Sequence, residues 1–344
     1  MMTRANFLHL LSLSLFKQFP EGVARVRTWE LSELKKDEVT DLISESLVFD
    51  GVVNLGTRRG KGPQPLGLGE IKRLTGINLG NHSVRLSSIE GLNRLCEIHR
   101  QSLMRINKAQ DIEAARATNR YGLIYYIQQG FDLKGSVEPL AAWKGEGLRC
   151  LQLTYTDNEL GGGSESDDRP LSSFGKRVVS ELNRLRMVVD VSHSGRRTTL
   201  DAAEASVHPV TANHANAIRL TSHRRNKTDE ELKAIAATGG VVGITGINRF
   251  LLGDSKTPAT LDDFVNHVDY VVEKIGVDHV GISSDSNIDG SQRYDVDYSD
   301  PLLCSFERWK RLARRLSDRG YRREHLQKIL GLNFKRVYET VLDP

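Results

Sequence analysis

The sequence predicts an α/β fold, a closed (β/α)8 barrel of the TIM type. Short apolar runs alternate along the chain with segments of helical periodicity, the order expected of repeated βαβ units around a parallel sheet. The runs are continuous and rich in β-branched residues, which is typical of strands buried on both faces. No GxGxxG turn follows any of these strands, so the sequence favours a closed barrel over an open, doubly wound sheet.

Each predicted strand is an apolar run bounded by turn residues or by a helical pattern. The run Gly-Leu-Ile-Tyr-Tyr-Ile-Gln at 122–128 is an example, because its apolar side chains follow one another without alternation. The eight predicted strands lie at 47–54, about 76–82, 122–128, 148–155, 187–193, 208–214, 241–247 and 278–285.

The helices between them are predicted from apolar spacing and capping residues. Apolar side chains recur at helical spacing within 173–186, and Thr228 with Glu231 three residues later forms a capping box that opens the helix at 228–238. The predicted helices lie at 34–46, about 88–105, 109–119, 137–146, 173–186, 195–206, 228–238, 260–275, about 303–319 and 323–341.

Length and composition predict one globular domain at 34–344, preceded by an N-terminal extension at 1–33. Of the 344 residues, 39% are hydrophobic and 27% are charged, which suits a chain with a substantial core. The net charge of +4 is small and spread out, so no nucleic-acid partner is expected. The three cysteines are scattered and form no CxxC pair. We therefore expect neither a disulfide framework nor a cysteine zinc site, and the pattern favours a reducing, cytoplasmic location.

The apolar run at 7–16 allows two interpretations. It follows Arg4, but it is short, is interrupted by His9 and serines, and lacks an A-x-A cleavage site. We therefore expect an amphipathic or frayed extension. The alternative is export, or association with a membrane surface through residues 1–20. No run reaches the roughly 20 apolar residues of a spanning helix, so no membrane span is expected.

Chemically capable side chains stand at the ends of five predicted strands: Gln128, Tyr155, His193, His214 and Asp285. The carboxyl ends of barrel strands meet on one face, where active sites of such barrels form. Neutral imidazoles from adjacent strands suit Zn²⁺ or a similar ion, so His193 and His214 are candidate metal ligands. Asp285 is a candidate general base acting on a water, or a further metal ligand.

Three more residues near this face have candidate roles. Arg225 follows the sixth strand and can grip a substrate carboxylate with its two-pronged guanidinium. Tyr155 can bind substrate and donate to a developing oxyanion, and the amide oxygen of Gln128 is a weak metal ligand. Ordinary structural explanations exist for each of these residues: a solvated basic loop, a rim aromatic, a hydrogen-bonded strand-end side chain. Asp190 is predicted to point away from the face and receives no role.

The segments that carry these residues resemble the membrane (renal-type) dipeptidases, zinc peptidase family M19. The resemblance covers about 45–340. Its ordered matches are Leu-Thr-Tyr-Thr-Asp-Asn at 153–158, the stretch 171–193 ending in Val-Val-Asp-Val-Ser-His, His214, His-Arg-Arg-Asn at 223–226, Ala-Thr-Gly-Gly-Val-Val-Gly at 237–243, Gly-Val-Asp-His-Val-Gly-Ile-Ser-Ser-Asp at 276–285 and Lys-Ile-Leu-Gly-Leu-Asn-Phe at 328–334.

The resemblance implies a barrel of the metal-dependent hydrolase kind that cleaves dipeptides at two zinc ions. By match, His193 and His214 belong to one metal site, Arg225 binds the substrate carboxylate and Asp285 handles the proton. Family members often pair, so the resemblance also implies a homodimer.

The sequence departs from the family pattern at the other metal. The family's first strand ends in Asp-Gly-His-x-Asp, where this chain has Asp-Gly-Val-Val-Asn at 50–54, and the bridging glutamate is Gln128. The histidine of Leu-Thr-His is Tyr155. Two cations need carboxylates between them, so we expect at most one Zn²⁺, held by His193 and His214 with Gln128 or water, and no dinuclear zinc.

The expected function is therefore a dipeptidase-like metallohydrolase with a degenerate metal site. Its substrate would be a dipeptide or a small amide bearing a carboxylate. Two alternatives stay open: a catalytically inactive homologue that binds a small ligand, and a lyase or tailoring enzyme that reuses the pocket.

Overall fold

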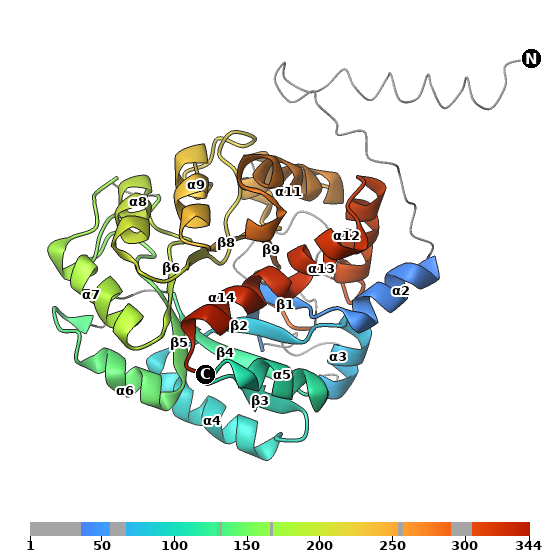
Figure 1. Cartoon of the computed structure of the whole chain (residues 1–344), viewed down its shortest axis with the longest axis horizontal. Coiled ribbons are helices and arrows are strands. Elements are labelled where there is room, and N and C mark those ends of the chain that lie inside the picture. Colours follow the sequence, from blue (N-terminus) through green and yellow to red (C-terminus); the bar gives the residue numbers. More distant parts are fainter. Residues whose placement is uncertain are drawn as a thin grey trace, which may run out of the picture.

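A closed parallel barrel forms the centre of the computed structural model (Figure 1). The structure describes residues 36–55, 67–128, 130, 133–165, 168–253, 257–289 and 305–344. The strands of the barrel are β1 (Phe49–Asn54), β2 (Leu79–Ser83), β4 (Tyr121–Ile127), β5 (Leu148–Gln152), β6 (Val188–Asp190), β7 (Val210–Ala212), β8 (Val241–Thr245) and β9 (Val280–Ser283). Each pairs in parallel with its neighbours, and the pairing of Asp50 in β1 with Ile282 in β9 closes the ring. The predicted (β/α)8 barrel is confirmed.

Two short strands add to the barrel. β3 (Leu103–Arg105) pairs with β4, and β10 (Ser286–Asn287) extends β9 along β1. The prediction of a continuous helix over 88–105 is wrong, because the helix ends at Ile98 and the chain then turns onto the flank of β4. Pairing with β4 is a tertiary contact that helical periodicity cannot reveal.

Helices surround the barrel as a shell (Figure 1). They are α2 (Lys36–Glu45), α3 (Leu68–Thr75), α4 (Ile89–Ile98), α5 (Gln110–Ala117), α6 (Pro139–Glu146), α7 (Ser173–Arg184), α8 (Arg196–Ala205), α9 (Asp229–Ala237), α10 (Asn248–Leu252), α11 (Leu261–Ile275), α12 (Arg308–Asp318), α13 (Arg323–Gln327) and α14 (Asn333–Val341). Two short 3₁₀-helices, η2 (Leu86–Ser88) and η4 (Val277–His279), and a short π-helix, η5 (Lys328–Leu332), join them. The sequence did not predict α3 or α10, nor the π-helix that interrupts the expected helix at 323–341.

The last helix, α14, lies across the amino end of the strands (Figure 1). Its Phe334 packs on Phe49 at the start of β1, with 5.0 Å between ring centroids. Gly281 makes room for this ring, since a Cβ there would collide with it, whereas a Cβ at Gly51 or Gly243 would collide first with the carbonyl oxygen of Asn213. This plug closes one end of the barrel and leaves the carboxyl ends of the strands as the place for chemistry.

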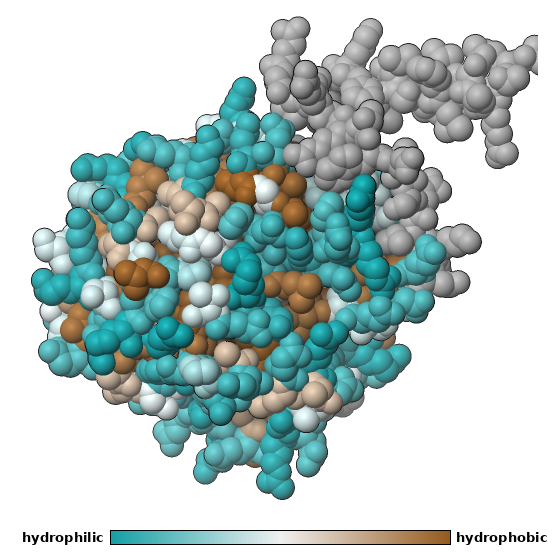
Figure 2. Space-filling view, in the orientation of Figure 1, coloured by the Kyte–Doolittle hydropathy of each residue, from teal (hydrophilic) through white to brown (hydrophobic). Residues whose placement is uncertain are grey.

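The shell presents mostly polar side chains on the α14 face, and apolar residues appear there in small separate patches (Figure 2). Among the helices that the structure describes, none is both long and apolar enough to cross a membrane. The expected extension at 1–33, with its apolar run, lies outside the described residues.

Candidate active site at the carboxyl end of the barrel

His193 and His214 meet directly beyond the ends of β6 and β7. Their Nε2 atoms are 2.9 Å apart, and both side chains are buried. A hydrogen bond needs one donor and one acceptor, so at least one of the two imidazoles is neutral with a bare Nε2. Burial lowers the pKa of His193 well below its usual range, and the charges of Arg225, His214 and Lys227 lower it further. The sequence-predicted pair is thus brought into contact, and burial favours the neutral form of His193.

Tyr155 covers the outer side of this pair. Its ring stacks on His193, with 4.0 Å between centroids and 23° between planes, and 42% of the residue is exposed. Such a contact contributes about 0.5–1.5 kcal/mol beyond the area it buries. The partly exposed ring of Tyr155 therefore covers one face of the imidazole of His193.

Arg225 lies inside the protein and not on a solvated loop. Its guanidinium donates from Nη1 to the carbonyl of Ser192 and from Nη2 to the carbonyl of His214, the latter at 3.3 Å. Its carbon Cζ also lies 5.2 Å from the centre of the Phe250 ring. Burial lowers the pKa of Arg225, while the carboxylates of Glu165 and Asp285 oppose that shift. The guanidinium is thus held beside both histidine loops and within the field of Asp285.

Asp285 follows β9 in a left-handed backbone conformation, with φ at 48°. Few non-glycine residues adopt this region, and they do so where the surroundings enforce it. The enforcing contact is its backbone N–H, which donates to the carbonyl of Val52 at 2.8 Å. The aspartate, which is buried, is in this way fixed against the end of β1.

The end of β1 supplies few metal-binding atoms. Val52 is fully buried with an apolar side chain, and the Nδ2 atom of Asn54 has no hydrogen-bond partner among the described residues. Gln128 is half-buried just after β4, and its carbonyl accepts a hydrogen bond from Gln152. Within the described parts of the chain, no group of three or more His, Cys, Asp and Glu side chains could hold a metal.

Asp190 corrects the prediction made from the sequence. It is buried and faces the inside of the barrel, where its Oδ1 accepts from the backbone N–H groups of Ser192 and Asn213. The sequence predicted a strand that continues to His193. The strand β6 ends at Asp190 itself, so alternation does not relate the two residues.

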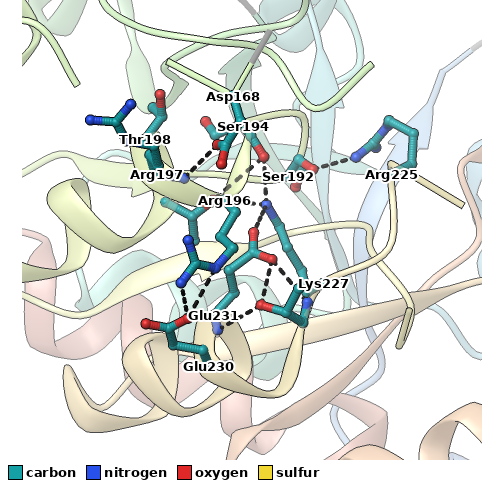
Figure 3. A network of polar contacts seen from close by, with 12 residues as sticks. Asp168, Ser192, Ser194, Arg196, Arg197, Thr198, Arg225, Lys227, Glu230 and Glu231 are labelled. Atoms are coloured by element: carbon teal, nitrogen blue, oxygen red, sulfur yellow. Dashed lines mark hydrogen bonds and ion pairs between the residues drawn. The ribbon is translucent and has the colours of Figure 1, made fainter. Parts of the chain in front are cut away.

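Two buried cationic side chains, Arg225 and Lys227, donate hydrogen bonds to the loop that carries His193. Lys227 donates from Nζ to the carbonyl of Ser194 at 2.8 Å and pairs with Glu231 at 3.1 Å, both side chains being almost fully buried. Figure 3 shows Arg225 bonded to Ser192 and Lys227 bonded to Ser194 and Glu231. The residues on both sides of His193 are therefore tied to the segment that follows His214. Sequence reasoning missed Lys227, although its position two residues after Arg225 was visible.

Comparison with known proteins identifies the family. Residues 73–343 match the family model of the membrane dipeptidases, peptidase family M19. The chain belongs to this family. M19 enzymes depend on zinc, so membership is consistent with the use of a divalent ion. The match begins after β1.

Similar proteins include two curated relatives and a solved structure. An uncharacterised dipeptidase of Schizosaccharomyces pombe is 29% identical over 74% of this chain and 61% of its own length. Dipeptidase tcpJ of Claviceps purpurea is 28% identical over 74% of this chain and 59% of its own length. The chain thus spans about three fifths of the length of these two curated relatives. The crystal structure of an amidohydrolase from Pseudomonas aeruginosa is 26% identical, with a TM-score of 0.78 over 88% of this chain and 99% of that one.

Proposed function

We propose that this chain is a hydrolase that cleaves the amide bond of a dipeptide or of a small molecule with an amide and a carboxylate. The observation that carries the proposal is the convergence of His193 and His214 beside the buried guanidinium of Arg225. The two relatives named dipeptidases support the substrate class.

Each residue of the site has a chemical task in this proposal. Each Nη of Arg225 carries two hydrogens, so the guanidinium keeps donors for a substrate carboxylate beyond its two bonds to the chain. Asp285 accepts the proton of the attacking water and passes it to the leaving amine. The hydroxyl of Tyr155 donates to the oxyanion that develops on the amide carbon.

We further propose that the site holds at most one divalent ion, on His193 and His214, with Gln128 or water completing the shell. When bound, such an ion would polarise the amide carbonyl and acidify a water. β1 provides no ligand for a second ion at Val52. The backbone carbonyl of Val52 accepts a hydrogen bond from Asp285, and its buried side chain is an isopropyl group, which cannot bind a metal. Two adjacent cations without carboxylates between them repel strongly.

Metal content and turnover test the proposal together. We expect purified protein loaded with Zn²⁺ or Co²⁺ to retain no more than one ion per chain and to hydrolyse members of a dipeptide panel. The double variant His193→Ala/His214→Ala should lose both properties. His208→Ala is the matched control, because His208 is only half-buried and lies before β7, away from the site. Retention of two ions contradicts the single-ion proposal, and absence of metal together with absence of hydrolysis contradicts the hydrolase.

The direct contact between His193 and His214 favours a second candidate, a homologue that binds a peptide-like ligand without cleaving it. In the absence of an ion, the Nε2 atoms of the two imidazoles already form a hydrogen bond with each other. This candidate predicts that a dipeptide raises the melting temperature of the protein, that the shift survives His193→Ala, and that no product forms. Turnover that persists in a chelator would instead indicate a lyase or tailoring reaction.

The proposal extends to the location, the domain division and the assembly of the protein. Cys96 and Cys150 are free thiols, which supports a reducing, cytoplasmic setting. We retain the division into an extension at 1–33 and one barrel domain at 34–344, and the homodimer that the family resemblance implies.

A further inference from the structure

We propose that Asp190 is the positioning residue of the candidate active site, because one of its carboxyl oxygens fixes the peptide groups that precede both histidines. As far as metal binding and turnover are concerned, this inference rests on the function proposed above. The placement of the two imidazoles can be tested without it.

The geometry at Oδ1 is the main observation. This atom accepts from the N–H of Ser192 at 3.2 Å and from the N–H of Asn213 at 2.8 Å. Ser192 directly precedes His193, and Asn213 directly precedes His214. The hydroxyl of Ser192 also donates to Oδ1 at 2.6 Å and accepts from the N–H of His214 at 3.1 Å. A single buried oxygen therefore links the two histidine loops.

The sheet itself does not provide this link. The pairing of β6 with β7 ends at Asp190 opposite Thr211, and the final ladder bond runs from the N–H of Val191 to the carbonyl of Thr211 at 2.8 Å. Beyond that bond, the segments that follow β6 and β7 have irregular backbone and carry His193 and His214. Where the strand pairing has ended, the carboxyl group of Asp190 is the hydrogen-bond acceptor for both segments. It therefore sets the distance between the two imidazoles.

The hydrogen bonds around the other oxygen of Asp190, Oδ2, indicate the protonation state of the carboxyl group. The amide nitrogen of Gln152 donates to two carbonyls, those of Gln128 and Thr154, so its Oε1 faces the hydroxyl of Tyr126 at 2.6 Å. A hydroxyl has one hydrogen, which Gln152 Oε1 takes. Oδ2 of Asp190, which also contacts Tyr126, must then supply the second hydrogen. Asp190 is inferred to be a neutral acid, and asparagine has the same shape and the same donor and acceptor positions.

The experiment compares Asp190→Asn with Asp190→Ala. Asparagine keeps the acceptor for both N–H groups and a donor for Tyr126, whereas alanine removes them. Two readouts are used: Co²⁺ affinity from the visible absorption of the protein titrated with the metal alone, and the side-chain ¹⁵N shifts of His193 and His214 without metal. Thr211→Val is the matched control, since it removes a buried hydrogen bond of β7 that touches neither histidine loop.

We expect Asp190→Ala to weaken Co²⁺ binding by about 10-fold to 100-fold and to move both sets of imidazole shifts. Asp190→Asn and Thr211→Val should stay close to the wild type. Asp190→Leu, which removes the acceptors but fills the space, replaces the alanine variant if that variant does not fold.

Two results would overturn the proposal. Unchanged affinity and unchanged shifts in Asp190→Ala would show that the histidines are held by other contacts. Equal losses in Asp190→Asn and Asp190→Ala would show that the negative charge matters and not the hydrogen-bond geometry. If the wild type binds no Co²⁺, the proposed metal site fails, and the imidazole shifts alone decide the positioning role.

Discussion

At the scale of single residues, the interior holds histidines in their neutral form. Burial lowers the pKa of His82 to about 3 and of His267 to about 4. His267, on α11, shows the structural reason most clearly. Its Nδ1 accepts from the N–H of Ala217 at 3.2 Å, and a protonated ring could not accept this bond. His267 thus stabilises the segment after His214 only while it remains neutral.

This state predicts a loss of stability in acid. The folded-state pKa of His267, about 4, is below the unfolded value of 6.5. Between these values the unfolded chain binds a proton that the folded chain does not. His267 should therefore lower the free energy of unfolding by about 1.4 kcal/mol per pH unit as the pH falls from 6.5 to 4. His267→Asn keeps an acceptor near Nδ1 and does not titrate.

Urea unfolding at several pH values measures this contribution. The variant should show a shallower dependence on pH than the wild type between pH 6.5 and 4, while the two slopes agree above pH 7. Parallel curves for the two proteins over the acidic range would show that His267 titrates alike in both states.

At the scale of elements, the first turn of α9 combines a helix cap with a buried ion pair. Thr228 accepts from the N–H of Glu231, and Glu231 accepts from the N–H of Thr228, which confirms the capping box predicted from the sequence. The same glutamate neutralises the buried ammonium of Lys227. One residue thus connects the start of a shell helix to the loop that carries His193.

We expect Glu231→Ala to be far more damaging than loss of the cap alone. Removing the carboxylate leaves Lys227 buried without its counter-ion and should lower the free energy of unfolding by about 3–5 kcal/mol. Thr228→Ala should lower it by about 1 kcal/mol. Asp263→Ala is the matched control, because Asp263 completes an equivalent capping box at the start of α11 on a more exposed surface. Equal losses for Glu231→Ala and Asp263→Ala, measured by denaturant unfolding, would contradict this account.

At the scale of the whole molecule, the two ends of the barrel have different roles: the amino ends of the strands contribute to stability, and the carboxyl ends carry the candidate active site. Phe334 and its glycine neighbours fill the amino end, and the histidine pair lies at the opposite end. Such a division is general for barrels of this type. Changes at the plug should therefore act on folding and leave metal binding intact.

This division predicts the outcome of two substitutions. Phe334→Ala should lower the free energy of unfolding by about 3–5 kcal/mol through the cavity it leaves. Gly281→Ala should lower it by about 1–3 kcal/mol, because the new methyl group collides with the Phe334 ring. Thermal or denaturant unfolding gives the stability, and a Co²⁺ titration of the folded fraction gives the affinity. A large loss of affinity in either variant would mean that the two ends are coupled.

Much of the fold was predictable because it depends on local patterns. Buried parallel strands are continuous apolar runs, and Thr228 with Glu231 marks a helix start whatever surrounds it. β3 and α10 were missed because they are short and owe their existence to contacts with distant segments. Asp190 was placed wrongly because the strand was predicted to continue to His193, whereas β6 ends at Asp190.

The sequence alone determined the barrel, its family and the side chains available at its carboxyl end, since these follow from periodicity and residue order. Only the tertiary structure decided that the imidazoles of His193 and His214 are in contact and that Arg225 and Lys227 are buried against the loops that carry them. It also decided that Asp190 accepts hydrogen bonds from both of these loops. The physical reason is that ligand geometry beyond a strand end is set by hydrogen bonds between segments far apart in the chain. No local pattern records those bonds.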